Sequence, residues 1–161
     1  MRVADEVWIS TALLHRAHPD RKSFSLREIR EMAAQEKLVN VHAPGFQHHV
    51  SYHCVASKQS NPGKLRMLTE EGRGLRRLFR FGDKEHPSRK GAKMKPNPDE
   101  IDPKYLYLLE WYDTAYCSQD LNEVNSGPVK RMVMLGRIMA RVTNMSNSEL
   151  AELERKLGPR T

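Results

Sequence analysis

Two alternating runs of apolar and polar residues, joined by a glycine-containing turn, constrain the fold of this chain more than any other feature. The runs read KLRMLTE and LRRLFRF, and the turn between them reads EGRG. Alternation of this kind is typical of half-buried strands, and a short connection that contains glycine favours a β-hairpin. We therefore predict a hairpin over residues 64–81, with Leu75, Arg77, Phe79 and Phe81 on one face of its second strand.

Positive charge is concentrated on this hairpin and on the segment that follows it. Residues 57–95 contain twelve Lys or Arg and four Asp or Glu, a local net charge of +8 in a chain whose formal net charge is +7. Clustered positive charge attracts polyanions, because each neutralised phosphate releases condensed counterions. Arg73, at the tip of the hairpin, is best placed to enter a minor groove. The residues expected to hold phosphates are Lys58, Lys64, Arg66, Arg73, Arg76, Arg77 and Arg80.

Three helices are predicted before the hairpin from the spacing of apolar residues and from the signals at helix ends. Ser25 and Glu28 have the spacing of a capping box, in which each residue bonds the backbone amide of the other at a helix start. The predicted helices cover residues 5–16, 26–37 and 46–57, and residues 23–24 form a very short strand.

The third helix is predicted to have a polar exposed face. At about 100° per residue, Phe46, Val50, His53 and Cys54 fall on the side that faces the core. Side chains such as Gln, His and Ser hydrogen-bond to base edges, and Gln pairs with adenine through two bonds. An ordinary polar helix surface is the alternative interpretation. The residues expected to read bases are Gln47, His48, Ser51 and Tyr52, and Val55 falls on the same side.

The order helix, short strand, helix, helix, hairpin resembles that of the winged helix-turn-helix domain. The matching segments are VWISTALLHRA, SFSLREIREMAA, GFQHHVSYHCVAS and KLRMLTEEGRGLRRLFRF, and they are similar to small winged-helix modules of bacterial proteins. The resemblance implies a mainly α fold with a small β-hairpin, of the α+β class, over residues 1–82. It also implies that helix 46–57 enters the major groove and that the hairpin, called the wing, contacts the backbone or the minor groove.

The remainder of the chain is divided into a linker and a helical extension. Residues 83–101 have no periodicity and contain three prolines, so we expect a basic, flexible linker. Asp102 and Pro103 are a typical helix start, and we expect residues 102–161 to form a helical extension, with helices over 103–117, 129–142 and 146–157.

The extension is expected to form a homodimer or to bind a partner protein. Its first helix is rich in aromatic residues and its second in methionine, and both kinds of surface are used for docking. Packing of the first helix into the core of the same chain is the alternative. The residues expected at the partner contact are Tyr105, Leu108, Leu109, Tyr112, Met132 and Met139.

No motif for catalysis is found. The sequence has no glycine-rich phosphate loop, no Gly-x-Ser-x-Gly motif and no Cys-x-x-Cys pair. His49 and His53 have a spacing that can hold a metal, but the Glu of the metalloprotease motif is missing, and we expect histidines beside the core or near phosphate instead. We therefore expect no enzymatic activity, metal or cofactor. Cys54 and Cys117 are expected to be buried, reduced thiols.

The combined expectation is a cytoplasmic, nucleoid-associated protein that binds double-stranded DNA, as a bacterial transcriptional regulator or an antitoxin-like repressor. No stretch is apolar enough for a membrane span or a signal peptide. Two alternatives stay open: a winged helix that acts as a protein-interaction or RNA-binding adaptor, and a non-catalytic subunit of a restriction or repair system. Burial of His48, Ser51 and Tyr52 under the C-terminal helices would favour the adaptor.

Overall fold

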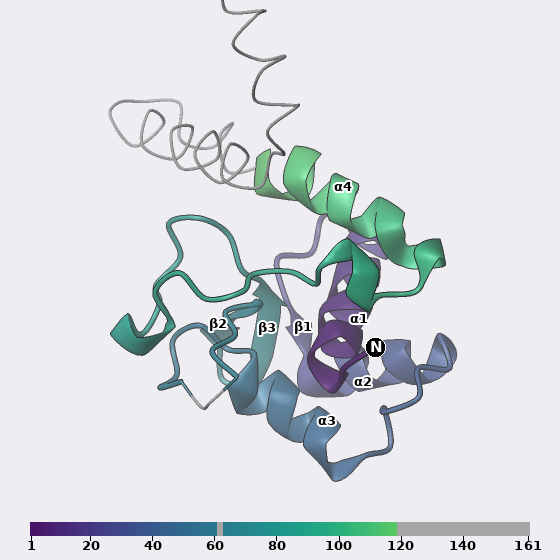
Figure 1. Cartoon of the computed structure of the whole chain (residues 1–161), viewed down its shortest axis with the longest axis horizontal. Helices are drawn as coiled ribbons and strands as arrows, with labels where there is room; N and C mark the ends of the chain where they lie inside the picture. The colour runs from purple at the N-terminus through teal and green to yellow at the C-terminus, as the bar shows by residue number, and fades with distance from the viewer. Residues whose placement is uncertain (61–62, 119–161) are drawn as a thin grey trace, which may run out of the picture. The chain divides into compact units, whose positions relative to one another are not determined.

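Helix α1 (Val3–Ala17) forms the centre of the fold. The structure is a computed structural model that describes residues 1–60 and 63–118, all within one compact unit, 1–118 (Figure 1). All nine residues from Ala4 to Ala12 are buried. Ser10 and Thr11 are tolerated inside because their hydroxyls donate to the carbonyls four residues earlier, at 2.7 and 2.8 Å. The helix predicted to be amphipathic is therefore covered on all its faces over this stretch.

Within the described residues, a small antiparallel sheet and three further α-helices surround α1. The strands have the order β1-β3-β2, and Phe24 of β1 is the partner of Arg76 in β3. The hairpin turns at Gly74, whose φ of +76° suits glycine. The α+β class is thus confirmed for the described residues. In chain order the elements are β1 (Phe24–Ser25), α2 (Leu26–Gln35), α3 (Pro44–His48), the π-helical turn η1 (His49–His53), β2 (Leu68–Gly72), β3 (Leu75–Leu78), the 3₁₀ turns η2 (Pro87–Arg89), η3 (Pro98–Glu100) and η4 (Pro103–Tyr105), α4 (Leu106–Thr114) and the 3₁₀ turn η5 (Tyr116–Ser118).

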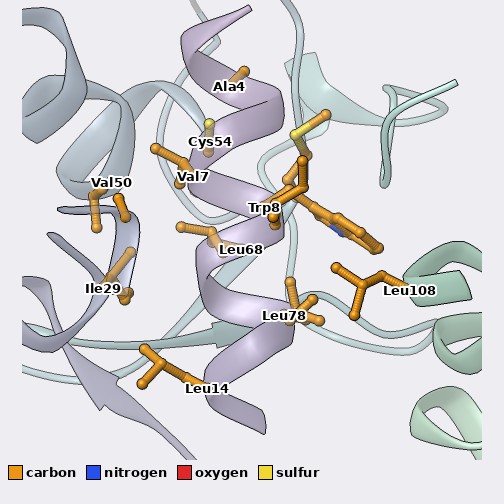
Figure 2. Packing of buried hydrophobic residues seen from close by; sticks show 14 of the residues in the cluster. Ala4, Val7, Trp8, Leu14, Ile29, Val50, Cys54, Leu68, Leu78 and Leu108 are labelled. Atoms are coloured by element: carbon orange, nitrogen blue, oxygen red, sulfur yellow. The ribbon is translucent and has the colours of Figure 1, made fainter. Parts of the chain in front are cut away.

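The hydrophobic core lies on opposite sides of α1. Figure 2 shows Ile29 of α2 and Val50 of η1 on one side of this helix, and Leu78 of β3 and Leu108 of α4 on the other. The Trp8 ring of α1 packs edge-on against a tyrosine of α4, with ring centroids 5.5 Å apart. Aromatic pairs in this geometry stabilise a core beyond the area they bury. The core therefore needs both the helix-rich first half of the chain and α4.

Helix α4 belongs to this core and is not a separate extension. The hydroxyls of Tyr112 and Tyr116 donate to the carbonyls of Phe79 and Leu78, at the end of the hairpin. Helix α4 thus packs into the core of its own chain, which is the alternative to partner binding given above. Its inward side chains are therefore not available to a partner. Four residues predicted at a partner contact are buried here: Tyr105, Leu108, Leu109 and Tyr112. Met132, Met139 and the helices predicted over 129–142 and 146–157 lie outside the described residues.

Residues 83–101 are packed against the fold, whereas the sequence predicts a flexible linker there. The Arg66 amide donates to the Lys93 carbonyl at 2.9 Å, and Lys93 forms ion pairs with Asp5 and Glu100. Arg89 is completely buried. Bonds from side chains to the backbone hold this segment, and such bonds need no apolar periodicity. For this reason the composition of the segment does not reveal that it is ordered.

The capping box predicted at the start of α2 is present. The Ser25 hydroxyl accepts from the Glu28 amide at 3.2 Å, and the Glu28 carboxylate accepts from the Ser25 amide at 2.8 Å. Arg21 donates to the same carboxylate at 2.6 Å. The Arg21 side chain, followed by the Ser25 amide, lowers the pKa of Glu28 to about 2.

Replacing Glu28 with Gln is expected to lower the free energy of unfolding by up to about 1 kcal/mol at neutral pH, because Gln can still accept from the Ser25 amide but loses the ion pair with Arg21. Because the folded pKa lies below the ordinary value of 4.5, the carboxylate stabilises the fold above that pH, and this contribution is lost as the pH falls towards about 2. Urea unfolding at several pH values should give curves for wild type and Glu28→Gln that converge in acid. Arg27→Ala, on the exposed face of α2, serves as the control; a difference that persists in acid would contradict the assignment.

Both cysteines lie in the part of the chain that the structure describes. Cys54 and Cys117 are buried thiols that form no disulfide with each other, as predicted. Within residues 1–60 and 63–118, no helix combines the length and apolar character that crossing a membrane requires.

Candidate nucleic-acid interface

The third helix changes from α to π geometry after His48. In the π turn the Cys54 amide donates to the carbonyl of His49, five residues earlier, at 3.0 Å. A π turn accommodates one more residue than an α turn, so side chains after it are rotated relative to a regular helix. Two predictions of facing were wrong for this reason: Val55 is buried, and His53 is half-buried beside His48 instead of in the core.

The side chains predicted to read bases lie on the open side of this helix. Gln47 and His48 are exposed, and Ser51 and Tyr52 are half-buried. Helix α4 packs against α1, away from α3 (Figure 1). Of the C-terminal helices predicted from the sequence, the one that the structure describes therefore leaves this face uncovered.

Arg76 turns inwards, although the sequence predicts that it holds phosphate. Its side chain is only 4% exposed and forms an ion pair with Glu70 at 3.0 Å. It also donates to the carbonyls of Val50 and Ser51, at 3.2 and 3.3 Å. These bonds satisfy the guanidinium inside the protein and attach the second strand of the hairpin to the third helix. Arg76 is thus a structural link between the two predicted contact elements.

Other predicted phosphate contacts are also occupied by acidic partners. Arg77 pairs with Asp83 through two bonds, at 2.6 and 2.7 Å, and with Glu71. Arg80 lies over the Tyr116 ring, 4.0 Å from its centroid. The remaining ion pairs of this set join Arg66 to Glu85 at 2.7 Å and Lys58 to Glu70 at 2.9 Å.

A smaller set of cations stays available to a polyanion. A count of charges in the sequence does not show which of them form ion pairs, because contacts of the hairpin and the loops determine which acidic residue lies beside which basic residue. Lys93 and Lys95 are paired with acids outside the basic segment, Lys95 with Asp113. Among the described residues of the basic stretch 57–95, the Lys and Arg side chains that are exposed and form no ion pair are Lys64, Arg73, Lys84 and Lys90.

Arg89 organises the backbone next to this surface and was missed by the sequence analysis. A guanidinium has five N–H donors, and here they meet five different carbonyls. Nε donates to Lys58 at 2.6 Å, Nη1 to His53 at 2.6 Å and to Leu65, and Nη2 to Tyr52 at 3.3 Å and Gln59 at 3.0 Å. These carbonyls belong to the end of η1 and to the loop that leads into the hairpin. No local sequence pattern indicates such a role.

Three histidines of the third helix lie in contact with one another. The ring centroids of His48 and His53 are 4.5 Å apart, and those of His49 and His53 are 5.0 Å apart. Nδ1 of His49 lies 3.6 Å from the sulfur of Cys54. In the part of the chain that the structure describes, no group of three or more His, Cys, Asp or Glu has an arrangement suited to a metal ion.

Comparisons with known proteins give no relative for this chain. No protein-family model, curated protein or solved structure matches it significantly. The assignment of a function therefore rests on the geometry of the chain itself.

Proposed function

We propose that this chain is a DNA-binding protein in which the first three helices and the hairpin act as a winged helix-turn-helix domain. In this proposal α3 and η1 enter the major groove, with Gln47, His48, Ser51 and Tyr52 towards the bases. Lys64 and Arg73 of the hairpin contact phosphates. A bacterial transcriptional regulator or an antitoxin-like repressor is the biological role that we infer.

The attachment of the hairpin to the third helix carries this proposal. Arg76 bonds the carbonyls of Val50 and Ser51 while it pairs with Glu70 of β2. The two elements that would contact DNA are thereby held at a fixed separation, and a preorganised surface loses less entropy on binding. The element order α1, β1, α2, α3, β2, β3 also agrees with the order that the resemblance to winged-helix domains implies.

The neutralised arginines favour a second candidate function. Because Arg66 and Arg77 are held by Glu85 and Asp83, the hairpin offers less charge to phosphate than its composition suggests. A winged helix that binds a protein or single-stranded RNA would need less of this charge. The binding experiment must therefore distinguish an adaptor for protein or RNA from a protein that binds duplex DNA.

Replacing Lys64 and Arg73 together with Ala is expected to weaken binding to random-sequence duplex DNA about tenfold or more at low salt. Each lost phosphate contact should also reduce the slope of log K against log salt by about 0.9. Fluorescence anisotropy with a labelled duplex, measured over a salt series, gives both values. Single-stranded RNA of the same length is measured alongside.

The matched control is Arg16→Ala with Lys104→Ala, which removes the same charge from residues that contact the aromatic rings of Tyr107 and Tyr105. It should retain wild-type affinity and salt slope. Equal losses in both double variants would mean that net charge alone drives binding. Absence of duplex binding at low salt would reject the DNA-binding proposal, and binding of RNA alone would favour the adaptor.

A further inference from the structure

The histidine cluster on the third helix exists because of the π turn. An α-helix aligns residues three and four apart, whereas the i→i+5 bonding of η1 aligns residues five apart. His48 and His53 are separated by five positions, and their rings are the closest pair in the cluster, at 4.5 Å. His49 completes the cluster through its contact with His53 at 5.0 Å. A regular helix would have directed His53 towards the core.

Two rings of the cluster, His49 and His53, have pKa values below that of an ordinary histidine. Burial, followed by the neighbouring His53 and His48, lowers the pKa of His49 below the ordinary 6.5. Burial, then His48 and Arg89, lowers the pKa of His53 in the same way. His49 and His53 therefore resist protonation, first because burial disfavours the charged ring and then because neighbouring positive charge repels the added proton. A negative charge placed against the rings would remove that resistance.

Charges of both signs lie near the cluster: Arg89 and Arg76 are positive, Asp5 is negative, and Arg76 is paired with Glu70. Helix α2 also packs on this turn, but the residues that it buries, Ile29 and Ala33, are uncharged. A phosphate that docked on the rings would be attracted by the positive charge of Arg89, which lies next to His53. The phosphate would in turn favour protonation of the imidazoles. Burial raises the pKa of the Cys54 thiol, and Asp5 of α1, which lies nearby, raises it further. Arg76 of β3 donates to the carbonyls of Val50 and Ser51, and Arg89 of η2 donates to those of Tyr52 and His53. Tyr52 and Cys54 are the other titratable groups at the turn.

We propose that His48, His49 and His53 form a site for a backbone phosphate of nucleic acid, and that this site takes up protons when the phosphate docks. The inference rests on the proposed DNA-binding function and assigns His48 to phosphate instead of to a base. By linkage, phosphate raises the proton affinity of the rings, and protonation raises the affinity for phosphate by the same factor. Duplex binding therefore tightens as the pH falls through the range in which histidine titrates.

The test measures the affinity of the full chain for a labelled duplex at about pH 7.5, 6.5 and 5.5 and at constant ionic strength. For wild type, affinity should rise by up to about tenfold per pH unit for each proton taken up. His48→Gln with His53→Gln should flatten this dependence. His48→Lys carries a permanent charge at an exposed position, so it should bind more tightly than wild type at about pH 7.5 and respond less to acid.

Two controls keep the result interpretable. His42→Gln changes an exposed histidine outside the cluster and should keep the wild-type pH dependence. Circular dichroism at each pH measures the folded fraction of every variant, so that unfolding in acid is not counted as lost binding. In NMR titrations, the ring protons of His49 and His53 should also report higher pKa values when the duplex is added.

The outcomes separate this inference from the proposed function. Duplex binding with the same pH dependence in wild type and in the double histidine variant would overturn the histidine site and leave the DNA-binding proposal standing. No duplex binding at any pH would overturn both. A flattened dependence in the double variant, with wild-type behaviour in His42→Gln, would establish the site.

Discussion

Arg89→Ala is expected to lower the free energy of unfolding by more than about 4 kcal/mol, and to prevent folding if the total stability is near the lower end of the usual 5–15 kcal/mol. The change removes all five hydrogen bonds that the guanidinium donates to backbone carbonyls, and Arg89 itself is completely buried. A buried polar group without a partner costs about 1–3 kcal/mol. Water can replace only part of what the guanidinium provides, because Arg89 lies inside the fold.

Arg89→Lys and Lys90→Ala are the comparisons for this measurement. Lysine keeps the positive charge but has three donors on one atom, so it cannot reach carbonyls that lie around a planar guanidinium. We expect Arg89→Lys to lose about half as much stability as Arg89→Ala. Lys90 is exposed, and Lys90→Ala should behave as wild type in urea unfolding. A loss of less than about 1 kcal/mol in Arg89→Ala would show that these hydrogen bonds do not support the fold.

Acidification is expected to destabilise the protein through His15, by an amount on the order of 4 kcal/mol between neutral pH and about pH 3. Burial, followed by the charges of Arg80 and Arg77, lowers the pKa of His15 to about 3. The unfolded chain binds a proton at this residue below about pH 6.5, and the folded chain does not until about pH 3. Stability is therefore complete above about 6.5 and is lost progressively as the pH falls to about 3.

His15→Gln tests this pH dependence. The variant should be less stable at neutral pH, because the His15 ring packs edge-on against Phe24, with centroids 4.9 Å apart. Its stability should nevertheless change less between about pH 6.5 and 4.5, the range above the titration of most carboxylates. Urea unfolding at four or five pH values measures the slope, and His18→Gln, an exposed neighbour, should retain the wild-type slope. Equal slopes for His15→Gln and wild type would rule out His15 as the main acid-sensitive group.

Features determined by neighbouring residues could be predicted from the sequence. Ser25 and Glu28 form the predicted capping box, since the bonds involve residues three apart and depend on nothing else. The hairpin also lies where the alternation and Gly74 indicate. The alternation does not tell which residues of the second strand face inwards: Arg76 and Leu78 are buried, whereas Leu75 is exposed. The carbonyls of Val50 and Ser51 in η1, together with the Glu70 carboxylate, make the interior acceptable to that arginine.

Features determined by distant residues could not be predicted in this way. Charge counting treats Arg73 and Arg77 alike, yet Arg77 is paired with Asp83 and Arg73 remains exposed. The π turn has no recognised sequence pattern, so the position of His53 could not be derived from regular helical spacing. Tyr112 shows the same limit: its aromatic face predicts docking, but only the tertiary structure reveals that the surface it meets is α1 and the end of the hairpin.

The burial of α1 on all its faces has a consequence for how this domain can be recombined, in evolution or by design. The hairpin and the first three helices do not form a transferable cassette, since the side of α1 that holds Trp8 is closed by Leu108 and Tyr112. A chimaera joined after Gly82 would leave that side in water and would also lack Arg89. The smallest unit that can be exchanged between proteins therefore extends through the 3₁₀ turn Tyr116–Ser118, so the segment that looks like a spacer in the sequence travels with the surface that we propose to contact DNA.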